Sequence, residues 1–479
     1  MPHNLQFAQS LYDGYETYKE KSLFNRRFKH SDIVPLIEQL KNKNIFKVKK
    51  VGESVQGRDI FLISIGTGAK KIFCWSQMHG DEPTATAAIF DIFNFFLHED
   101  HYIEFKNSLL NNVTLFFLPM VNPDGAELFQ RFNILDIDLN RDAARKQSPE
   151  SKVLYSVFNE INPDFGFNLH DQGREYSAGI KSRSAVISFL APPFDYAKTI
   201  NDNRTNSMKL ISKLYNILSL MIPGHIAKYQ DDHEPRAFGD NFSKSDTSII
   251  LIESGAWRGD REKQFLRKLN FVSLLAFFKS IAEDSYLNES IETYYSIPPN
   301  ESLMIDCIIR NVTVIKEGNK IIVDVGINYK EINIEDNRQF YYKAAIEDIG
   351  DLSVYTGFRE FDAMGMSLQL GKTYAKIFNT LDQIKNLDFA TLIETGVTNV
   401  KLRASSIKEL YSPVLFNIIL NDKDRIEELK QEAVPNFILK ENDTFKCALI
   451  NGFLLDSISM HWDEGNSLIF KKKIENSIE

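Results

Sequence analysis

The chain has 479 residues and a formal net charge of −9, and 43% of its residues are hydrophobic and 25% charged. This length predicts two or three domains, and the composition argues against a disordered or membrane-embedded protein. The acidic balance indicates no nucleic-acid partner, and three widely spaced cysteines (Cys74, Cys307 and Cys447) indicate no disulfide framework.

The first part of the chain predicts a helical lead-in, a β-hairpin, a buried strand and a helix. We assign the polar, helical residues 1–35 to the lead-in, and the stretch 46–66, which turns at Gly57, to the hairpin. "KKIFCWSQ" (70–77) is typical of a buried strand. Pro83 then suits the first turn of a helix. The apolar residues of that helix recur at spacings of three and four: Ala85, Ala88, Ile89, Ile92, Phe93 and Phe96.

Strands and helices continue to alternate along the chain. Further strands are predicted at 113–119 (followed by the turn "NPDG"), 164–169, 186–192 and 248–252, and a helix at about 262–282. This order predicts an α/β fold over residues 36–295: an α/β/α sandwich with a mixed, largely parallel sheet.

The two prolines of "YSIPPNES" (295–302) predict a domain boundary. Alternating patterns beyond it predict a β-rich domain over residues 300–479, with a helical segment near "DKDRIEELKQEA" (422–433). We find no catalytic motif in this domain. It could dock a partner or a second subunit.

Three residues suggest a metal site. His79 and Glu82 lie three positions apart, where a strand ends and a helix begins, and His170 ends another predicted strand. Zinc accepts imidazole and carboxylate ligands, and ligands of open α/β sheets gather at the carboxyl ends of strands. The alternative is that Glu82 only caps the helix and His170 is an ordinary loop histidine.

Two other stretches carry groups suited to binding and catalysis. Asn140 and Arg141, with Arg131 upstream, could bind a carboxylate, or they could form a surface salt-bridge loop. Glu253 ends the apolar run "ILI", and a buried carboxylate is costly unless it is paired or functional.

In this order, "HGDE", "NPDG", an arginine followed by "DLNRD", "NLHDQ" and "LIESG" form a recognisable set. From about Leu36 to Asp284, the chain resembles the zinc carboxypeptidases related to carboxypeptidase A, as a bacterial-type member with an extra C-terminal region. The resemblance implies one zinc ion, a general base, an arginine that stabilises the oxyanion, and a pair that binds the substrate carboxylate. By position these are His79, Glu82 and His170 for zinc, Glu253 for the base, Arg131 for the oxyanion, and Asn140 with Arg141 for the carboxylate.

The chain also departs from the family pattern. Asp81 stands where several relatives have arginine, and the shorter separation of Glu82 and His170 predicts trimmed loops and a more open cleft. Nothing local identifies a substrate-capping tyrosine, although Tyr229 lies at a plausible distance before the base. Asp240 could attract a basic side chain, but the pattern "GDN" favours an ordinary turn residue.

These features predict a zinc-dependent exopeptidase that removes the C-terminal residue of peptides with a free carboxylate. Alternatives are an amidase of the same fold that acts on murein peptides or N-acyl amino acids, and a non-catalytic peptide-binding protein. The first residues contain no continuous apolar run, and no stretch of about 18 apolar residues occurs anywhere. A cytoplasmic location without membrane contact is therefore expected. Nothing in the sequence indicates an oligomeric state.

Overall fold

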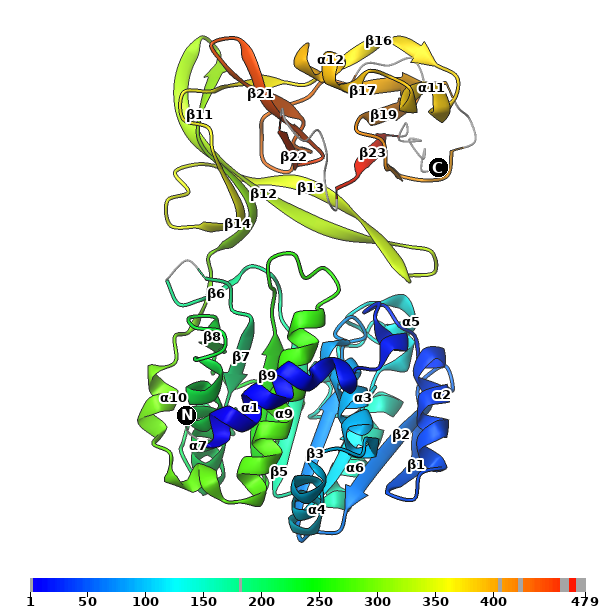
Figure 1. Cartoon of the computed structure of the whole chain (residues 1–479), viewed down its shortest axis with the longest axis vertical. Coiled ribbons are helices and arrows are strands. Elements are labelled where there is room, and N and C mark those ends of the chain that lie inside the picture. The colour runs from blue at the N-terminus through cyan, green and yellow to red at the C-terminus, as the bar shows by residue number, and fades with distance from the viewer. Residues whose placement is uncertain (1–2, 181–182, 404–406, 421–424, 457–464, 471–479) are drawn as a thin grey trace. The chain divides into compact units, whose positions relative to one another are not determined.

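The computed structural model describes residues 3–180, 183–403, 407–420, 425–456 and 465–470 (Figure 1). The chain forms two compact units. Unit 1 comprises Met1–Ser302 with Asp336–Arg338, and unit 2 comprises Leu303–Glu335 and Gln339–Glu479. None of the described helices combines the length and the apolar character that crossing a lipid bilayer would need.

Unit 1 is built on an eight-stranded sheet in the order β1-β2-β4-β3-β5-β9-β7-β8. The strands are β1 (Phe46–Glu53), β2 (Asp59–Gly66), β3 (Lys70–Ser76), β4 (Val113–Leu118), β5 (Phe165–Asp171), β7 (Ile187–Leu190), β8 (Ile226–Lys228) and β9 (Ser248–Ser254). The central pairs β4–β3, β3–β5 and β5–β9 are parallel, as is β7–β8, and the other three pairs are antiparallel. The prediction of a mixed, largely parallel sheet is confirmed.

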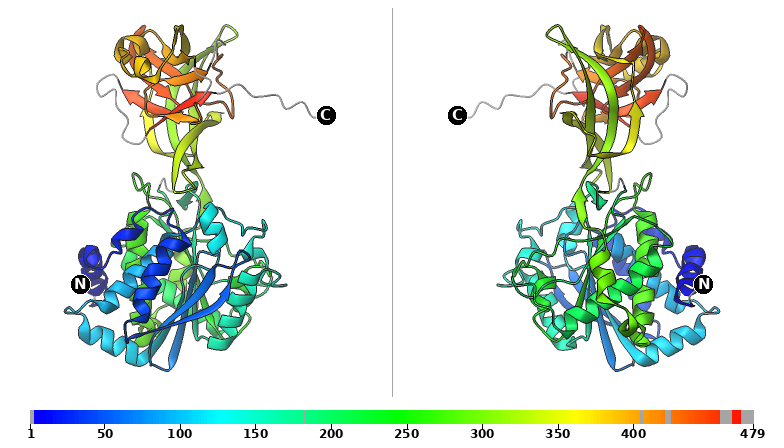
Figure 2. Two further views of the ribbon diagram at one scale, coloured as in Figure 1. Left: turned by 90° about the vertical axis from the view of Figure 1, so that its right-hand side faces the viewer. Right: turned by 90° about the vertical axis from the view of Figure 1, so that its left-hand side faces the viewer.

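Helices cover both faces of this sheet (Figure 2). Because side chains alternate along a strand, Ile72 and Cys74 of β3 pack into one core, while Phe73 and Trp75 pack into the other. The first core includes α1 (His3–Gly14), α3 (Thr84–Leu97), α7 (Asp202–Leu218) and α9 (Gln264–Ala282). The second includes α6 (Pro149–Ile161) and α8 (Phe238–Phe242). Because both faces of the sheet are covered by helices, the central strands consist of continuous runs of apolar residues.

The lead-in bonds to a buried ion pair between α3 and α9. Arg267 of α9 donates to both oxygens of Asp91 in α3, at 2.7 and 2.5 Å, and the two side chains are 1% and 0% exposed. The hydroxyl of Tyr15 and the backbone N–H of Glu20 also donate to Asp91. The carboxylate is therefore fully bonded although it is out of contact with water.

We expect Asp91→Ala to lower the free energy of unfolding by about 3–5 kcal/mol, because it leaves the guanidinium of Arg267 buried without its counter-charge. Urea titration of the purified variant measures this. Glu160→Ala is the control. It removes an exposed pair with Lys49 and should cost at most about 1 kcal/mol. Equal losses in the two variants would show that the buried Asp91 pair contributes no more to the free energy of unfolding than the exposed pair does.

The carboxyl ends of β3, β5 and β9 form one edge of the sheet. Ser76 of β3 is in register with Leu169 of β5, and His170 is in register with Glu253 of β9. The "NPDG" stretch is more than the predicted turn. It begins the short helix α5 (Pro123–Leu128), because the Asn122 side chain accepts the backbone N–H of Gly125 and Pro suits the first helical position.

The loop after β3 packs tightly on α5. A Cβ on Gly80 would lie 2.0 Å from the carbonyl carbon of Gly125, so a side chain at position 80 cannot be accommodated. The Asn122 amide also donates to the carbonyl of Met78. These contacts hold the residues on both sides of Gly80, namely His79 and Glu82, against a rigid neighbour.

Unit 2 is rich in strands, as predicted. Its larger sheet has the order β13-β12-β11-β15-β20-β21-β22, with β14 beside β11, and its smaller sheet has the order β16-β17-β19-β23-β18. The strands of the larger sheet are β11 (Met304–Lys316), β12 (Asn319–Ile334), β13 (Gln339–Gly350), β14 (Thr356–Asp362), β15 (Ser367–Leu370), β20 (Phe437–Glu441), β21 (Thr444–Ile450) and β22 (Phe453–Asp456). Those of the smaller sheet are β16 (Lys372–Phe378), β17 (Val397–Leu402), β18 (Tyr411–Ser412), β19 (Asn417–Leu420) and β23 (Ser467–Phe470).

The helical segment predicted near 422–433 is wrong for the part that the structure describes. Residues 425–433 form no helix, and 422–424 lie outside the described residues. The α-helices described in unit 2 are α11 (Leu381–Lys385) and α12 (Phe389–Glu394). Strongly helix-favouring residues at 425–433 are thus overridden by their tertiary surroundings: Glu427 is buried and bonds to Asn399 and Asn436.

Candidate metal centre

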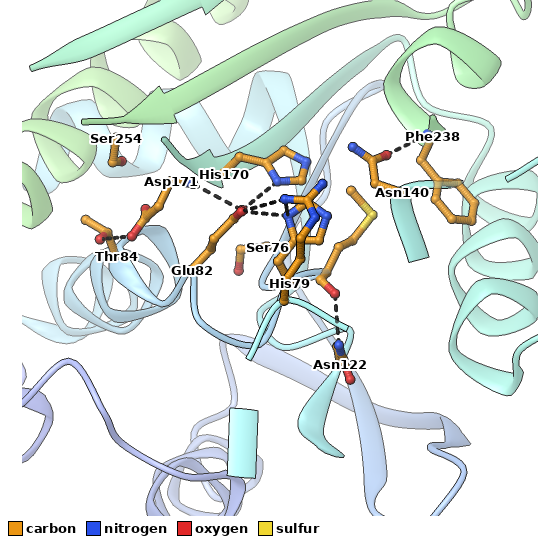
Figure 3. Close-up of polar contacts among 12 residues, drawn as sticks. Ser76, His79, Glu82, Thr84, Asn122, Asn140, His170, Asp171, Phe238 and Ser254 are labelled. Carbon is orange, nitrogen blue, oxygen red and sulfur yellow. Dashed lines mark hydrogen bonds and ion pairs between the residues drawn. The ribbon is translucent and has the colours of Figure 1, made fainter. Parts of the chain in front are cut away.

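His79, Glu82 and His170 meet at the carboxyl edge of the sheet (Figure 3). The Nδ1 atoms of His79 and His170 lie 2.6 and 2.7 Å from the two carboxylate oxygens of Glu82. The potential ligand atoms of the three residues all lie within 4.8 Å of one another, and all three residues are buried. Glu82 and His170, which are 88 positions apart in the sequence, thus place their potential ligand atoms close together.

This donor set fits a zinc ion. Two imidazole nitrogens and one carboxylate are typical of catalytic zinc sites, where three protein ligands leave one position open. The Nε2 atom of His79 lies 3.1 Å from Oδ1 of Asp138. A carboxylate there holds the proton on Nε2, which leaves the Nδ1 lone pair free to bind a metal. Among the described residues, Nε2 of His170 is buried and has no hydrogen-bond partner.

The pKa values of these three side chains depend on one another. Burial opposes protonation of His79, but the Glu82 carboxylate and Asp138 outweigh it and raise the pKa of His79 to about 9. Burial likewise disfavours the charged carboxylate, yet the two imidazoles hold the pKa of Glu82 well below its ordinary value. For His170, burial dominates and lowers the pKa. The centre therefore keeps a carboxylate charged in a place where water cannot stabilise it.

Arg131 lies at the rim of this centre. Its guanidinium is 3.2 Å from Nδ1 of His79 and 3.6 Å from Oε1 of Glu82, and it donates to Asp138 at 3.0 Å. Its side chain is 39% exposed. It sits where it can reach both the centre and solvent.

Glu253 is buried beside His170 on the neighbouring strand β9. The described residues offer its carboxylate no hydrogen-bond partner, and burial together with Glu82 raises its pKa well above the ordinary value. An uncompensated buried acid is costly, so its retention in a cavity wall is typical of a functional group.

Asn140 and Arg141 lie in the 3₁₀ turn Leu139–Arg141. Asp138 caps this turn by accepting the backbone N–H of Asn140, so one carboxylate organises both His79 and this turn. Oδ1 of Asn140 accepts the backbone N–H of Phe238 at the start of α8. Arg141 lies 3.5 Å from Glu234 and is partly exposed.

One cavity of about 320 Å³ brings these groups together. All seven predicted site residues line it, along with Tyr229, Asp240 and Asn168. Asp138 and Asn168 are not among the predicted site residues. An aspartate two positions before Asn140 in "DLNRD" was the only local signal for Asp138, and Asn168 gave none.

The profile of the zinc carboxypeptidase family matches residues 33–184, which include all three metal-centre residues. This part of the chain is similar to the zinc carboxypeptidase family. Carboxypeptidase SOL1 of Arabidopsis thaliana is 25% identical over 142 residues, which are 26% of this chain and 29% of that protein. Carboxypeptidase 2 of Trichophyton rubrum is 25% identical over 152 residues, or 30% of this chain and 27% of that protein. The chain thus spans less than a third of the length of these relatives.

Solved zinc carboxypeptidase structures are also similar. A metallo-carboxypeptidase from Burkholderia cenocepacia has 17% identity and a TM-score of 0.42, covering 54% of this chain and 69% of that one. Carboxypeptidase A from Helicoverpa armigera has 14% identity and a TM-score of 0.44, covering 59% of this chain and 80% of that one.

We expect Asp138→Asn to weaken zinc binding by about 10- to 100-fold, because Asp138 orients His79 and polarises its ring. Competition with a chromophoric chelator measures the affinity. Asp136→Asn, two residues earlier in the same loop and exposed, is the matched control and should leave the affinity unchanged. Unchanged affinity in Asp138→Asn would mean that the Nε2 contact does not support the metal.

Proposed function

We propose that the chain is a zinc-dependent carboxypeptidase that hydrolyses the C-terminal peptide bond of peptides with a free carboxylate. One observation carries the proposal: a three-ligand centre and a cationic turn, Asn140–Arg141, line the same cavity. A metal centre that activates water and a clamp for a chain end are the two parts that an exopeptidase needs.

In this proposal, His79, Glu82 and His170 hold the zinc ion, whose contribution is Lewis-acid activation of water and of the scissile carbonyl. Glu253 takes a proton from the attacking water and later passes it to the leaving amine. Arg131 stabilises the negative charge that develops on the carbonyl oxygen, since its guanidinium already lies at the rim of the centre.

In this proposal, Asn140 and Arg141 form a carboxylate clamp, and the clamp determines which peptide bond is hydrolysed. The guanidinium of Arg141 can form paired bonds with a terminal carboxylate, and the amide N–H₂ of Asn140 is available because its oxygen is already engaged by Phe238. Holding the chain end there places the last peptide bond near the metal centre. The cytoplasmic location expected from the sequence stays a prediction.

The first test is mass spectrometry of a mixed peptide library incubated with the protein, with and without a zinc chelator. Loss of single C-terminal residues that the chelator blocks is the expected result. C-terminally amidated copies of the same peptides should resist, because they lack the carboxylate. If a zinc-loaded protein cleaves nothing, the proposal fails, and N-acyl amino acids and murein peptides are then the substrates to try.

We expect Arg141→Ala to raise KM for free-carboxylate peptides by about 10- to 100-fold, the value of a hydrogen bond to a charged group. Steady-state kinetics on one peptide measures this. Arg236→Ala is the control, because Arg236 bonds to the same Glu234 but does not line the cavity. An equal change in both variants would point to disturbance of Glu234 and not to loss of the clamp.

A further inference from the structure

The last segment of unit 1, residues 298–302, is bonded to one wall of the cavity. It includes the short strand β10 (Asn300–Ser302), which pairs antiparallel with β6 (Tyr176–Ala178). The first residue of β6, Tyr176, lines the cavity and is in register with Ser302. The place of Tyr176 at the cavity therefore depends on a segment that lies much further along the chain.

The same segment is bonded to the strand that leads to a second tyrosine of this wall. The backbone N–H of Lys228, the last residue of β8, donates to the carbonyl of Pro298 at 2.7 Å. Tyr229 follows Lys228 and lines the cavity. Its ring centroid is 6.4 Å from that of Tyr176. Residues 298–302 thus bond to both of the short strands, β6 and β8, that position the two tyrosines.

A ring of side-chain hydrogen bonds joins Asn300 to the same wall. Its Nδ2 donates to Oε1 of Gln172 at 2.6 Å, and its Oδ1 accepts the hydroxyl of Ser188 at 2.8 Å. Nε2 of Gln172 donates in turn to this hydroxyl oxygen at 3.0 Å and to the carbonyl of Ala185 at 3.1 Å. Asn300, Gln172 and Ser188 are all buried. The ring therefore forms where water cannot take the place of a lost partner.

This ring of hydrogen bonds lies next to the groups assigned to catalysis. Gln172 lines the cavity and follows His170 by two positions. Ser188 of β7 is in register with Glu253 of β9, so the two side chains project from the same face of the sheet. Asn300 itself does not line the cavity. It can affect a bound peptide only through the residues that it holds.

We propose that Asn300 is a positioning residue: it holds the wall of the cavity so that Tyr176 and Tyr229 contact a bound peptide. The inference rests on the proposed carboxypeptidase function, and it gives a role to a segment outside residues 33–184, the part that the family profile matches. An amide suits this role because its oxygen and its N–H₂ group can bond to two partners at once. The competing account is that Asn300 contributes only to stability, by satisfying buried polar groups.

Asn300→Ala tests the role, because it removes both side-chain hydrogen bonds and leaves every cavity-lining residue in place. We expect KM for a free-carboxylate peptide to rise by about 5- to 10-fold, which corresponds to one neutral hydrogen bond. We expect kcat to stay within about threefold, because a displaced wall weakens binding of the ground state and the transition state equally.

Thr247→Val is the matched control for this substitution. It removes the buried hydrogen bond from the Thr247 hydroxyl to the carbonyl of Pro163, just before β9 begins, and position 247 does not line the cavity. It should lower the melting temperature, as Asn300→Ala should, but it should leave KM unchanged.

A variant that lacks both tyrosine rings shows whether Asn300 acts through them. In the background Tyr176→Ala with Tyr229→Ala, adding Asn300→Ala should change KM by no more than about twofold, because the side chains that it positions are already gone. The same 5- to 10-fold rise in this background would show that Asn300 affects peptide binding independently of the tyrosines.

Hydrogen exchange followed by mass spectrometry gives a readout that needs no substrate. The backbone N–H groups of Gly179 and Lys228 donate to carbonyls of residues 298–302, so their protection reports on this segment. We expect Asn300→Ala to speed exchange about 10-fold in fragments covering 176–179 and 226–230, and to leave the rest of unit 1 within about twofold. If this local change occurs but no peptide is cleaved, the carboxypeptidase proposal fails, and the hold of Asn300 on the wall stands.

Three results would overturn the inference. One is a KM in Asn300→Ala that is unchanged or rises no more than in Thr247→Val, which would assign Asn300 to stability alone. Another is an undiminished rise in KM when both tyrosine rings are absent. The third is exchange that accelerates equally throughout unit 1, which would mean that Asn300 stabilises the whole unit and does not position this wall.

Discussion

Replacing Glu253 by glutamine is expected to lower kcat by about 10²- to 10⁴-fold while zinc remains bound, because the amide can neither accept nor return a proton. Glu253 is buried in the cavity wall beside His170, and the described residues give its carboxylate no hydrogen-bond partner. It is therefore free to act on a bound water. Single-turnover kinetics on a lysine-terminated and a leucine-terminated peptide measures the loss, with metal content determined on the same samples.

Glu175→Gln is the control for this substitution. Glu175 lines the same cavity, but it is exposed, so its replacement should change kcat by no more than about threefold. Full activity in Glu253→Gln would remove this residue from the mechanism. Loss of zinc in Glu253→Gln would assign it to the metal centre instead.

Glu82→Gln and His170→Ala are each expected to abolish zinc retention and to leave the fold of unit 1 largely intact. Glu82 faces both histidines, so its replacement removes one ligand and the negative charge that draws the other two together. Removing one of only three protein ligands is more damaging than altering a residue that merely supports them, such as Asp138. Metal analysis after dialysis and far-UV circular dichroism report the two outcomes separately.

His101→Ala provides the comparison, because His101 is exposed, packs against Tyr102 and does not line the cavity. That variant should retain one zinc ion per chain. Stoichiometric zinc in Glu82→Gln or His170→Ala would exclude the altered residue as a ligand. Loss of helical and strand signal together with zinc would mean that the residue is needed for folding, and Glu82→Asp would then test the ligand role with the charge kept.

Local sequence patterns determined the main elements of unit 1. The run at 70–77 is apolar on both faces of the strand, and the structure places Ile72 and Phe73 in different cores. A strand buried on both sides needs helices on both sides, so the sandwich follows from the sequence. The metal-centre residues were also visible, because His79, Glu82 and His170 stand at the ends of such runs.

Patterns failed where distant contacts outweigh local preference. Residues 425–433 favour a helix in isolation, but Glu427 is buried and bonds to Asn399 of β17 and to Asn436, and no helix forms there. The support that Asp138 gives to His79 joins residues 59 positions apart, and no local spacing encodes such a contact.

The sequence by itself determined which chemical groups are present and at which strand ends they stand, because hydrophobic periodicity is a property of neighbouring residues. Only the tertiary structure decided which of these groups share a cavity. Asn140 meets α8 across 98 positions, and both line the cavity that holds the candidate metal centre. Such contacts form only when segments that are far apart in the sequence pack against the same edge of the sheet. Local periodicity does not encode this packing.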